Sequence, residues 1–246
     1  MSRGWIWGAA AAALLLATGV VAKTQVAKGY EIPSDQPMRL ITLRPDVTVG
    51  SLDAGGLEEP NADWTAQARE NLAKAVASNQ EARGFSTITL PDQTGDNAKV
   101  VDSYQKLFHA VSAAIFLHKF TPGAGLPTKK GEFNWTLGPG AAKLGEIGGG
   151  NYALFLYTHD SFGTDGRKAL QVAGLLGCAV GFCVVVPGGL HFYYASLVDL
   201  KSGDVVWFNF VPTARGDIRK PEGSQQLVDA LLSTMPMHHA GAGATK

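Results

Sequence analysis

The alternation of apolar and polar residues is most regular between positions 191 and 211, where two runs rich in aromatic and β-branched side chains flank a short polar turn. This pattern predicts an antiparallel hairpin, with Gly203 in a left-handed conformation at its turn. The run from 152 to 157 is apolar almost without interruption, which is typical of an interior strand covered on both faces. The sequence therefore predicts a sheet whose core surrounds these three strands.

Two further strands are indicated by shorter runs. Residues 38–43 and 85–90 combine alternation with β-branched side chains, as strands do. Polar, proline-containing or glycine-rich composition predicts turns or loops over 44–50, 54–63 and 159–166. We therefore expect the strands at 38–43 and 152–157 to end where these turns begin.

Helical spacing of apolar residues predicts two long helices between these strands. One is expected to begin at an Asp63 cap, and the other to begin at Asp96 or Asn97 and to end near Phe120. Shorter helices are expected after Pro139, after Asp165 and from Pro221 to Leu232.

Strands that alternate with helices, followed by a hairpin and a closing helix, predict an α/β fold. We expect a single domain, built on a mixed sheet with a C-terminal antiparallel hairpin and with helices on both faces. The domain is expected over residues 38–235 of the 246, after an extended leader over 23–37 and before a disordered tail over 236–246.

The first 22 residues resemble an export signal. Arg3 precedes an uncharged apolar run that ends with the small residues Val20 and Ala22, at the spacing that signal peptidase requires. Cleavage after Ala22 would release a periplasmic protein. The run is also about as long as the shortest membrane-spanning helices, near ~17 residues, so an uncleaved anchor in the inner membrane is the alternative.

Charge and glycine content exclude several classes of ligand. The chain has 21 basic and 21 acidic residues, so it lacks the basic excess that attracts a nucleic acid. Gly138, Gly140 and Gly145 do not have the spacing of a dinucleotide-binding loop, and Pro139 removes a backbone N–H that a phosphate would need. We therefore expect neither a nucleic-acid partner nor a cofactor.

Cys178 and Cys183 are the two cysteines of the chain. Export permits a disulfide between them, but their apolar surroundings also suit two free, buried thiols. At a separation of five residues the pair does not share a helix face, so a bridge requires the helix to end near Gly181. Both alternatives remain open at this stage.

No arrangement of residues predicts catalysis or metal binding. His159, Asp160 and Ser161 are adjacent, and adjacent side chains on a strand point in opposite directions, so they cannot form a relay. Their expected role is to form the turn after the strand. Because ligands of α/β sheets bind at strand ends, Asp160 and Ser161 are nevertheless the candidate binding residues. His109 and His118 lie about 13 Å apart along one predicted helix, too far to share a metal ion.

Large aromatic rings are concentrated in the predicted hairpin. Tyr193, Trp207 and Phe208 are favoured in strands, where such rings usually fill the core. An exposed aromatic patch that binds a partner is the alternative, so these three residues are further binding candidates.

The order of the segments "WTLGPGAAKLGEIGGGNYALFLYTHDSFGTDG", "YYASLVDLKSGDVVWFNF" and "GDIRKPEGSQQLVDALL" resembles a group of uncharacterised exported proteins of Gram-negative bacteria. Their domain is similar to the N-terminal α/β domain of the Tol-system translocation protein and to the periplasmic domain of the curli secretion channel. The resemblance covers about residues 38–232, and the turn in "DLKSGDVVW" is its clearest marker. It implies an envelope protein with a non-enzymatic role in assembly or interaction, and it implies no catalytic residues.

Many members of that group are lipoproteins, whereas no cysteine follows the apolar run here. We therefore expect a soluble periplasmic protein that binds another envelope protein, through the sheet edge and the hairpin. The alternative is a hydrolase or a small-molecule-binding domain with its site near Asp160 and Ser161. An enzyme requires a pocket with convergent titratable groups, whereas a binding protein requires an exposed apolar patch.

Overall fold

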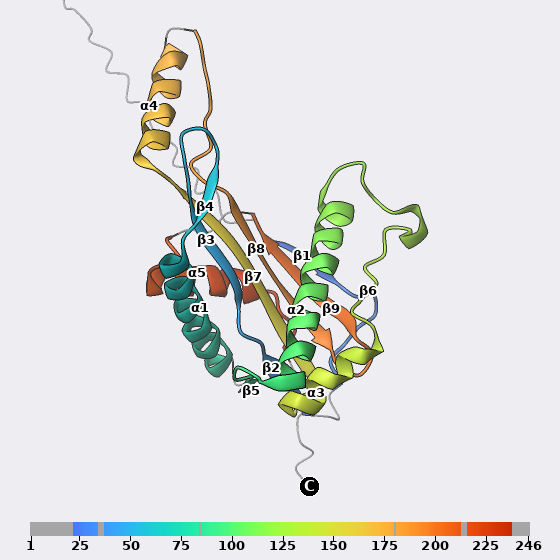
Figure 1. Cartoon of the computed structure of the whole chain (residues 1–246). Coiled ribbons are helices and arrows are strands. Elements are labelled where there is room, and N and C mark those ends of the chain that lie inside the picture. The colour runs from blue at the N-terminus through green and yellow to red at the C-terminus, as the bar shows by residue number, and fades with distance from the viewer. Residues whose placement is uncertain (1–21, 34–36, 84, 180, 213–215, 238–246) are drawn as a thin grey trace, which may run out of the picture.

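The computed structural model describes residues 22–33, 37–83, 85–179, 181–212 and 216–237. These residues form a mixed α/β fold with helices on both faces of one sheet (Figure 1). The predicted export signal lies almost wholly outside the described residues, as does most of the predicted tail. In the part of the chain that the structure describes, no helix has both the length and the apolarity that a membrane crossing requires.

The sheet has the strand order β1-β9-β8-β7-β2-β5, with β3 beside the outer half of β7, β4 beside β3, and β6 beside β9. β7 pairs in parallel with β2 and β3, and antiparallel with β8. The strands are β1 (Lys23–Val26), β2 (Arg39–Thr42), β3 (Asp46–Leu52), β4 (Glu58–Pro60), β5 (Ser86–Thr89), β6 (Trp135–Thr136), β7 (Tyr152–Gly163), β8 (His191–Asp199) and β9 (Asp204–Val211).

In the described part of the chain, five α-helices accompany these strands: α1 (Ala62–Ala82), α2 (Gly95–Ile115), α3 (Ala142–Gly148), α4 (Asp165–Ala179) and α5 (Pro221–Leu232). Helices were therefore predicted in the right places, with small shifts at their ends. Asn61 caps α1 through its side chain, two residues before the predicted cap Asp63. A π-helix over Phe116–Phe120 continues α2 to the predicted end.

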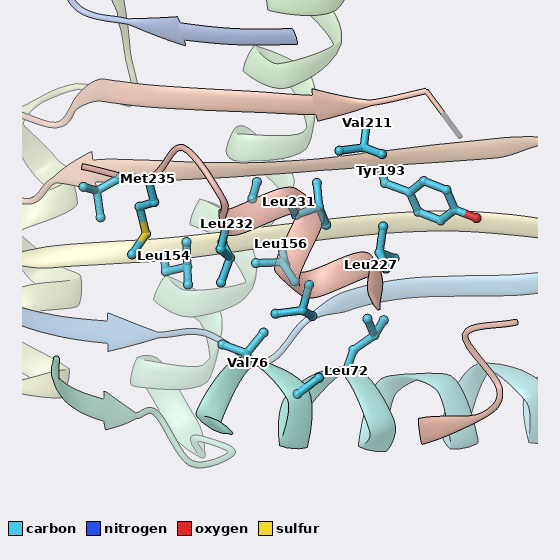
Figure 2. Close-up of a cluster of buried hydrophobic side chains, with 14 of the residues drawn as sticks. Leu72, Val76, Leu154, Leu156, Tyr193, Val211, Leu227, Leu231, Leu232 and Met235 are labelled. Carbon is cyan, nitrogen blue, oxygen red and sulfur yellow. The ribbon is translucent and has the colours of Figure 1, made fainter. Parts of the chain in front are cut away.

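Two hydrophobic clusters fill the two faces of the sheet. On one face α1 packs along β3, and α5 along β8 and β9. Their apolar side chains form one cluster with Leu154 and Leu156 of β7 (Figure 2). On the other face α2 and α3 cover the alternate side chains of the same strands. Side-chain alternation along a strand explains why a continuously apolar run serves both cores.

The predicted hairpin is confirmed. β8 pairs with β9 in antiparallel register, and Gly203 has a φ of 81°. A Cβ at this position would come within 1.9 Å of the Gly138 carbonyl oxygen. Glycine is therefore required both by the positive φ and by the close approach of the two chain segments. The aromatic rings of Tyr193, Trp207 and Phe208 are fully buried. The hairpin is therefore core, and the alternative of an exposed aromatic patch on these residues is wrong.

All three regions predicted as turns or loops contain strand residues, and β4 lies within the one over 54–63. Residues 46–52 form β3, which continues β2 after a break at Pro45, a residue that has no N–H for the ladder. β7 likewise does not end near Tyr157 but continues to Gly163, between β3 and β8. The prediction of a loop over 159–166 is therefore wrong for its first five residues. Their polar side chains find partners inside the fold, which the local pattern does not reveal.

The segment expected to be a leader also contributes to the sheet. β1 pairs antiparallel with β9 over four residues and forms one edge of the sheet. Thr24 donates a hydrogen bond of 3.1 Å to the buried Asn209 side chain. The sheet therefore begins at Lys23, fifteen positions before the predicted start of the domain at Met38.

Candidate functional site

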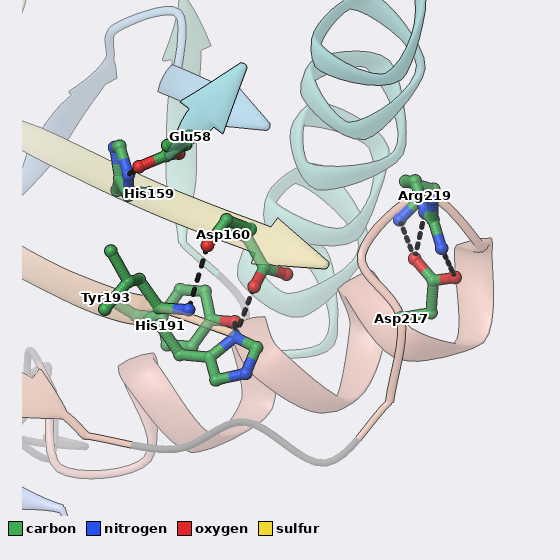
Figure 3. Close-up of polar contacts among 9 residues, drawn as sticks. Glu58, His159, Asp160, His191, Tyr193, Asp217 and Arg219 are labelled. Carbon is green, nitrogen blue, oxygen red and sulfur yellow. Dashed lines mark hydrogen bonds and ion pairs between the residues drawn. The ribbon is translucent and has the colours of Figure 1, made fainter. Parts of the chain in front are cut away.

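The candidate residue Asp160 lies inside β7, at the outer half of the strand, and is buried. Its carboxylate accepts a hydrogen bond from Nδ1 of His191, its antiparallel partner on β8 (Figure 3). The hydroxyl oxygen of Tyr193 lies 3.2 Å from the same ring nitrogen. The structure therefore joins two predicted candidates, Asp160 and Tyr193, through a histidine that the sequence did not single out.

Electrostatics strengthens this contact. The hydrogen bond to Asp160 raises the pKa of His191, against the opposing effect of partial burial. Burial, assisted by the negative charge of Asp160, raises the pKa of Tyr193, so its phenol keeps its proton. With Nδ1 donating to the carboxylate, Nε2 of His191 remains to exchange a proton or to accept a hydrogen bond.

Ser161 does not join this group. Its side chain alternates with that of Asp160, so it points to the opposite face of the sheet. Its hydroxyl accepts a 2.9 Å hydrogen bond from the backbone N–H of Leu190. Ser161 is fully buried and holds two chain segments together, so its position supports a structural role.

An open hollow of about 770 Å³ lies over His191. One wall is Arg219, whose guanidinium carbon is 3.8 Å from the centre of the Phe162 ring and 4.3 Å from that of Trp64. The same guanidinium donates two hydrogen bonds, of 2.7 and 2.8 Å, to the carboxylate of Asp217 (Figure 3). The cation is thus already neutralised and stacked, which leaves little of its charge for a ligand.

A second polar contact occupies the opposite face of the sheet. His159 lies 2.8 Å from a carboxylate oxygen of Glu58 on β4 (Figure 3). The ring of His109 on α2 stacks on Tyr157 at 4.6 Å between centres. These two histidines are therefore occupied in contacts between elements.

Within the described residues, the Asp160–His191 pair is not completed to a catalytic triad. The Asp160–His191 pair resembles the base half of a triad, but within the described residues His191 makes no hydrogen bond to a serine, threonine or cysteine side chain. Among the residues that the structure describes, no group of three or more His, Cys, Asp or Glu side chains could hold a metal ion.

The most unusual surface lies beyond the end of β7. There α4 projects from the sheet and the chain returns alongside it to β8 (Figure 1). We call residues 165–190 the arm. At its base Arg167 is buried and donates hydrogen bonds to the carbonyl oxygens of Pro187, at 2.7 Å, and of Asp53, at 3.1 Å. The first bond joins the two halves of the arm, and the second fixes the arm to the body.

Glycines allow the two halves of the arm to approach closely. A Cβ on Gly174 would come within 2.2 Å of the Val184 carbonyl oxygen, and one on Gly177 within 2.3 Å of that of Phe182. The side chain of Gln171 donates a 3.1 Å hydrogen bond to the Val186 carbonyl oxygen. The return segment therefore covers the glycine side of α4.

The other sides of the arm expose large apolar side chains. Leu175 and Leu176 are 66% and 67% exposed, and Phe182 and Val185 of the return segment 75% and 81%. Leu170, Val172 and Leu190 are also exposed. A contiguous apolar surface of this kind is rare on a protein that acts alone and is typical of an interaction site.

Cys178 and Cys183 form a disulfide at the tip of the arm. Both residues are exposed, so the alternative of two free, buried thiols is wrong. The helix ends at Ala179, close to the predicted position, and Gly181 has a positive φ of 87° that reverses the chain. The bridge ties α4 to the first residues of the return segment.

The arm was not predicted from the sequence, because the apolar residues 169–190 suit a buried helix equally well. One signal was available, since this run contains no Asp, Glu, Lys, Arg or His. Helices that pack on a sheet normally keep a polar face, so a run without one needs another environment.

No protein-family model matches the chain, and no curated protein resembles it significantly. Among solved structures, the PelC dodecamer from Paraburkholderia phytofirmans has a TM-score of 0.38 at 10% identity, over 87% of this chain and 96% of that chain. A single-residue variant of the same dodecamer gives 0.37 at the same identity and coverage. This likeness is too weak to support any inference about function.

Proposed function

We propose that this chain is a non-enzymatic protein of the cell envelope that acts by binding another envelope component through the arm. The observation that carries the proposal is the exposure of Leu175, Leu176, Phe182 and Val185 on a segment that projects from the fold. The export signal expected over residues 1–22 supports an envelope location.

The arm replaces the hairpin as the proposed binding surface. The hairpin rings lie between the two helical layers, so they are not accessible to a partner. The arm, in contrast, is held to the body by Arg167 and closed by a disulfide, and neither feature buries its apolar side chains. A pre-ordered surface loses less conformational freedom on binding, which favours affinity.

A small-molecule site in the hollow over His191 is the second candidate function. It is favoured by Nε2 of His191, which has no hydrogen-bond partner among the described residues and lies beside a volume of about 770 Å³. The absence of a hydrogen-bonded nucleophile in the described residues weighs against a hydrolase there.

Photo-crosslinking in intact cells tests the proposal. A photoreactive residue in place of Phe182 should give discrete adducts, whereas the same residue in place of Lys74, an exposed position on α1, should not. The adducts should disappear when Leu175 and Leu176 are both replaced by glutamine.

The variant His191→Gln separates the two candidate functions. It should leave the adducts at position 182 unchanged, because His191 lies outside the arm. Adducts that are lost in His191→Gln, or that are the same at positions 182 and 74, would contradict binding through the arm.

A further inference from the structure

We infer that the arm inserts its tip into one leaflet of a lipid bilayer. This inference rests on the proposed function, and it names the envelope component that the arm contacts.

The side chains of the arm beyond its base, residues 169–190, suit hydrocarbon. From residue 169 to residue 190 the one polar side chain besides the cysteines is Gln171, and its amide already donates to the Val186 carbonyl oxygen. Both thiols are consumed in the disulfide. No charged or unpaired side-chain donor would therefore have to leave water when this segment enters lipid.

The exposed apolar residues lie on both halves of the arm. At 100° per residue, Val172, Leu175 and Leu176 fall within about 100° of one another on α4, on the side away from Gly174 and Gly177, which the return segment covers. Phe182 and Val185 extend the apolar surface over the return segment. A groove on a partner protein would have to cover both segments, whereas lipid surrounds them.

The dimensions fit one leaflet. Residues 169–179 of α4 span about 16 Å at 1.5 Å per residue, close to half of a hydrocarbon core of about 30 Å. α4 is one of the described helices that cannot cross a membrane. The arm therefore has the depth for one leaflet and not for two.

Charged residues resume at the base of the arm. Asp165 and Lys168 form an exposed ion pair of 2.9 Å in the first turn of α4. At the other end of the arm His191 begins β8 and faces the hollow. Both chain segments thus change from apolar to polar at the base of the arm, as expected of a segment that crosses from hydrocarbon into the headgroup region.

Photo-labelling from lipid tests this inference on the full chain. Vesicles of phosphatidylethanolamine and phosphatidylglycerol carry a trace of a phospholipid with a diazirine in its acyl chain. After irradiation, reduction and digestion with trypsin, residues 169–190 of the arm lie in peptide 169–201, the N-terminal apolar segment in peptide 4–23, and part of α2 in peptide 107–119. Insertion of the arm is thereby read separately from insertion of the N-terminus.

The expected result is labelling of peptide 169–201 about tenfold or more above peptide 107–119. In the variant with Leu175, Leu176 and Phe182 all replaced by glutamine, that labelling should fall about tenfold. The matched control is Leu117→Gln, which changes an exposed leucine outside the arm and should leave the labelling unchanged.

Equal labelling of peptides 169–201 and 107–119, or labelling that persists in the triple variant, would overturn the inference. If labelling is absent and the wild-type chain sediments as an oligomer that the triple variant does not form, a second copy covers the arm and the lipid inference fails. Adducts from position 182 to a protein in cells, without lipid labelling, would leave the proposed function standing. If neither lipid labelling of the arm nor protein adducts at position 182 are found, both the lipid inference and the proposed function are contradicted.

Discussion

The apolar side chains of the arm should contribute little to the free energy of unfolding. This prediction distinguishes a binding surface from side chains that belong to the folded core. The perturbation is the triple variant Leu175→Gln, Leu176→Gln and Phe182→Gln, called the arm variant below. Leucine and glutamine have nearly equal helix propensities, so the change at the two helical positions acts mainly through burial.

The magnitude follows from the exposed fractions. Burying a whole leucine or phenylalanine side chain contributes about 1.5–3 kcal/mol. Leu175 and Leu176 keep about a third of their surface covered, and Phe182 about a quarter. Each position therefore contributes about 0.5–1 kcal/mol, and the methylenes of glutamine retain part of that contact. We expect the arm variant to lose about 1 kcal/mol in total.

Urea denaturation followed by tryptophan fluorescence measures this loss. The matched control is Leu154→Ala, at a fully buried leucine of β7, which should alone cost about 2–5 kcal/mol. If the arm variant loses more than about 3 kcal/mol, its side chains belong to the folded core, and the reasoning from exposure to binding is refuted.

Three further predictions concern the packing within the arm, the contact between Asp160 and His191, and the buried amide of Asn209. Gly174→Leu should displace the return segment, because its Cβ would meet the Val184 carbonyl oxygen at 2.2 Å, and amide exchange there should accelerate. His191 has a raised pKa, so its pairing with Asp160 should be complete below the unfolded pKa near ~6.5 and weaken as pH rises through the folded value, seen as a falling urea midpoint. Asn209→Leu should cost about 1–3 kcal/mol in urea, because it leaves carbonyl oxygens of α5 without their donor.

Each of these three has its own control. Gly166→Ala should leave exchange unchanged, because its Cβ has ordinary contacts, so acceleration in that variant too would exclude a local clash. His191→Gln should flatten the pH dependence, and an unchanged slope would assign it to another group. For Asn209, the exposed Asn134→Leu should be nearly neutral, and equal losses in the two variants would refute the role of the buried amide.

The strands and helices that form the layers of this fold could be predicted from the sequence. In these elements the local pattern of apolar residues matches the way each element packs in the fold. The run 152–157 is apolar because β7 has a core on both faces, and the glycine of the hairpin turn has a geometric cause that any sequence must satisfy. The outer half of β7 could not be predicted in this way. His159 and Asp160 are polar, but each is paired by a residue far away in sequence, and turn formers have the same composition.

Of the candidate site, Asp160 was predicted from the sequence and its partner His191 was not. Asp160 was found from its position after an apolar run, although the strand does not end there, and its partner His191 became visible when antiparallel pairing placed the two opposite each other. The exposure of the arm could not be predicted from the local sequence pattern. Apolar content states that a segment avoids water, but whether protein or another medium covers it depends on what packs against it.

Hydroxyl-radical footprinting tests most directly whether the arm is covered in its native setting. Oxidation of peptide 169–201 is compared with that of peptide 107–119, once in the purified chain and once in intact cells. The account predicts that the arm side chains, led by Phe182 at 75% exposed, react readily in the purified chain and are protected in cells, while the control peptide reacts alike in both. Equal oxidation of the arm in the two settings would contradict it.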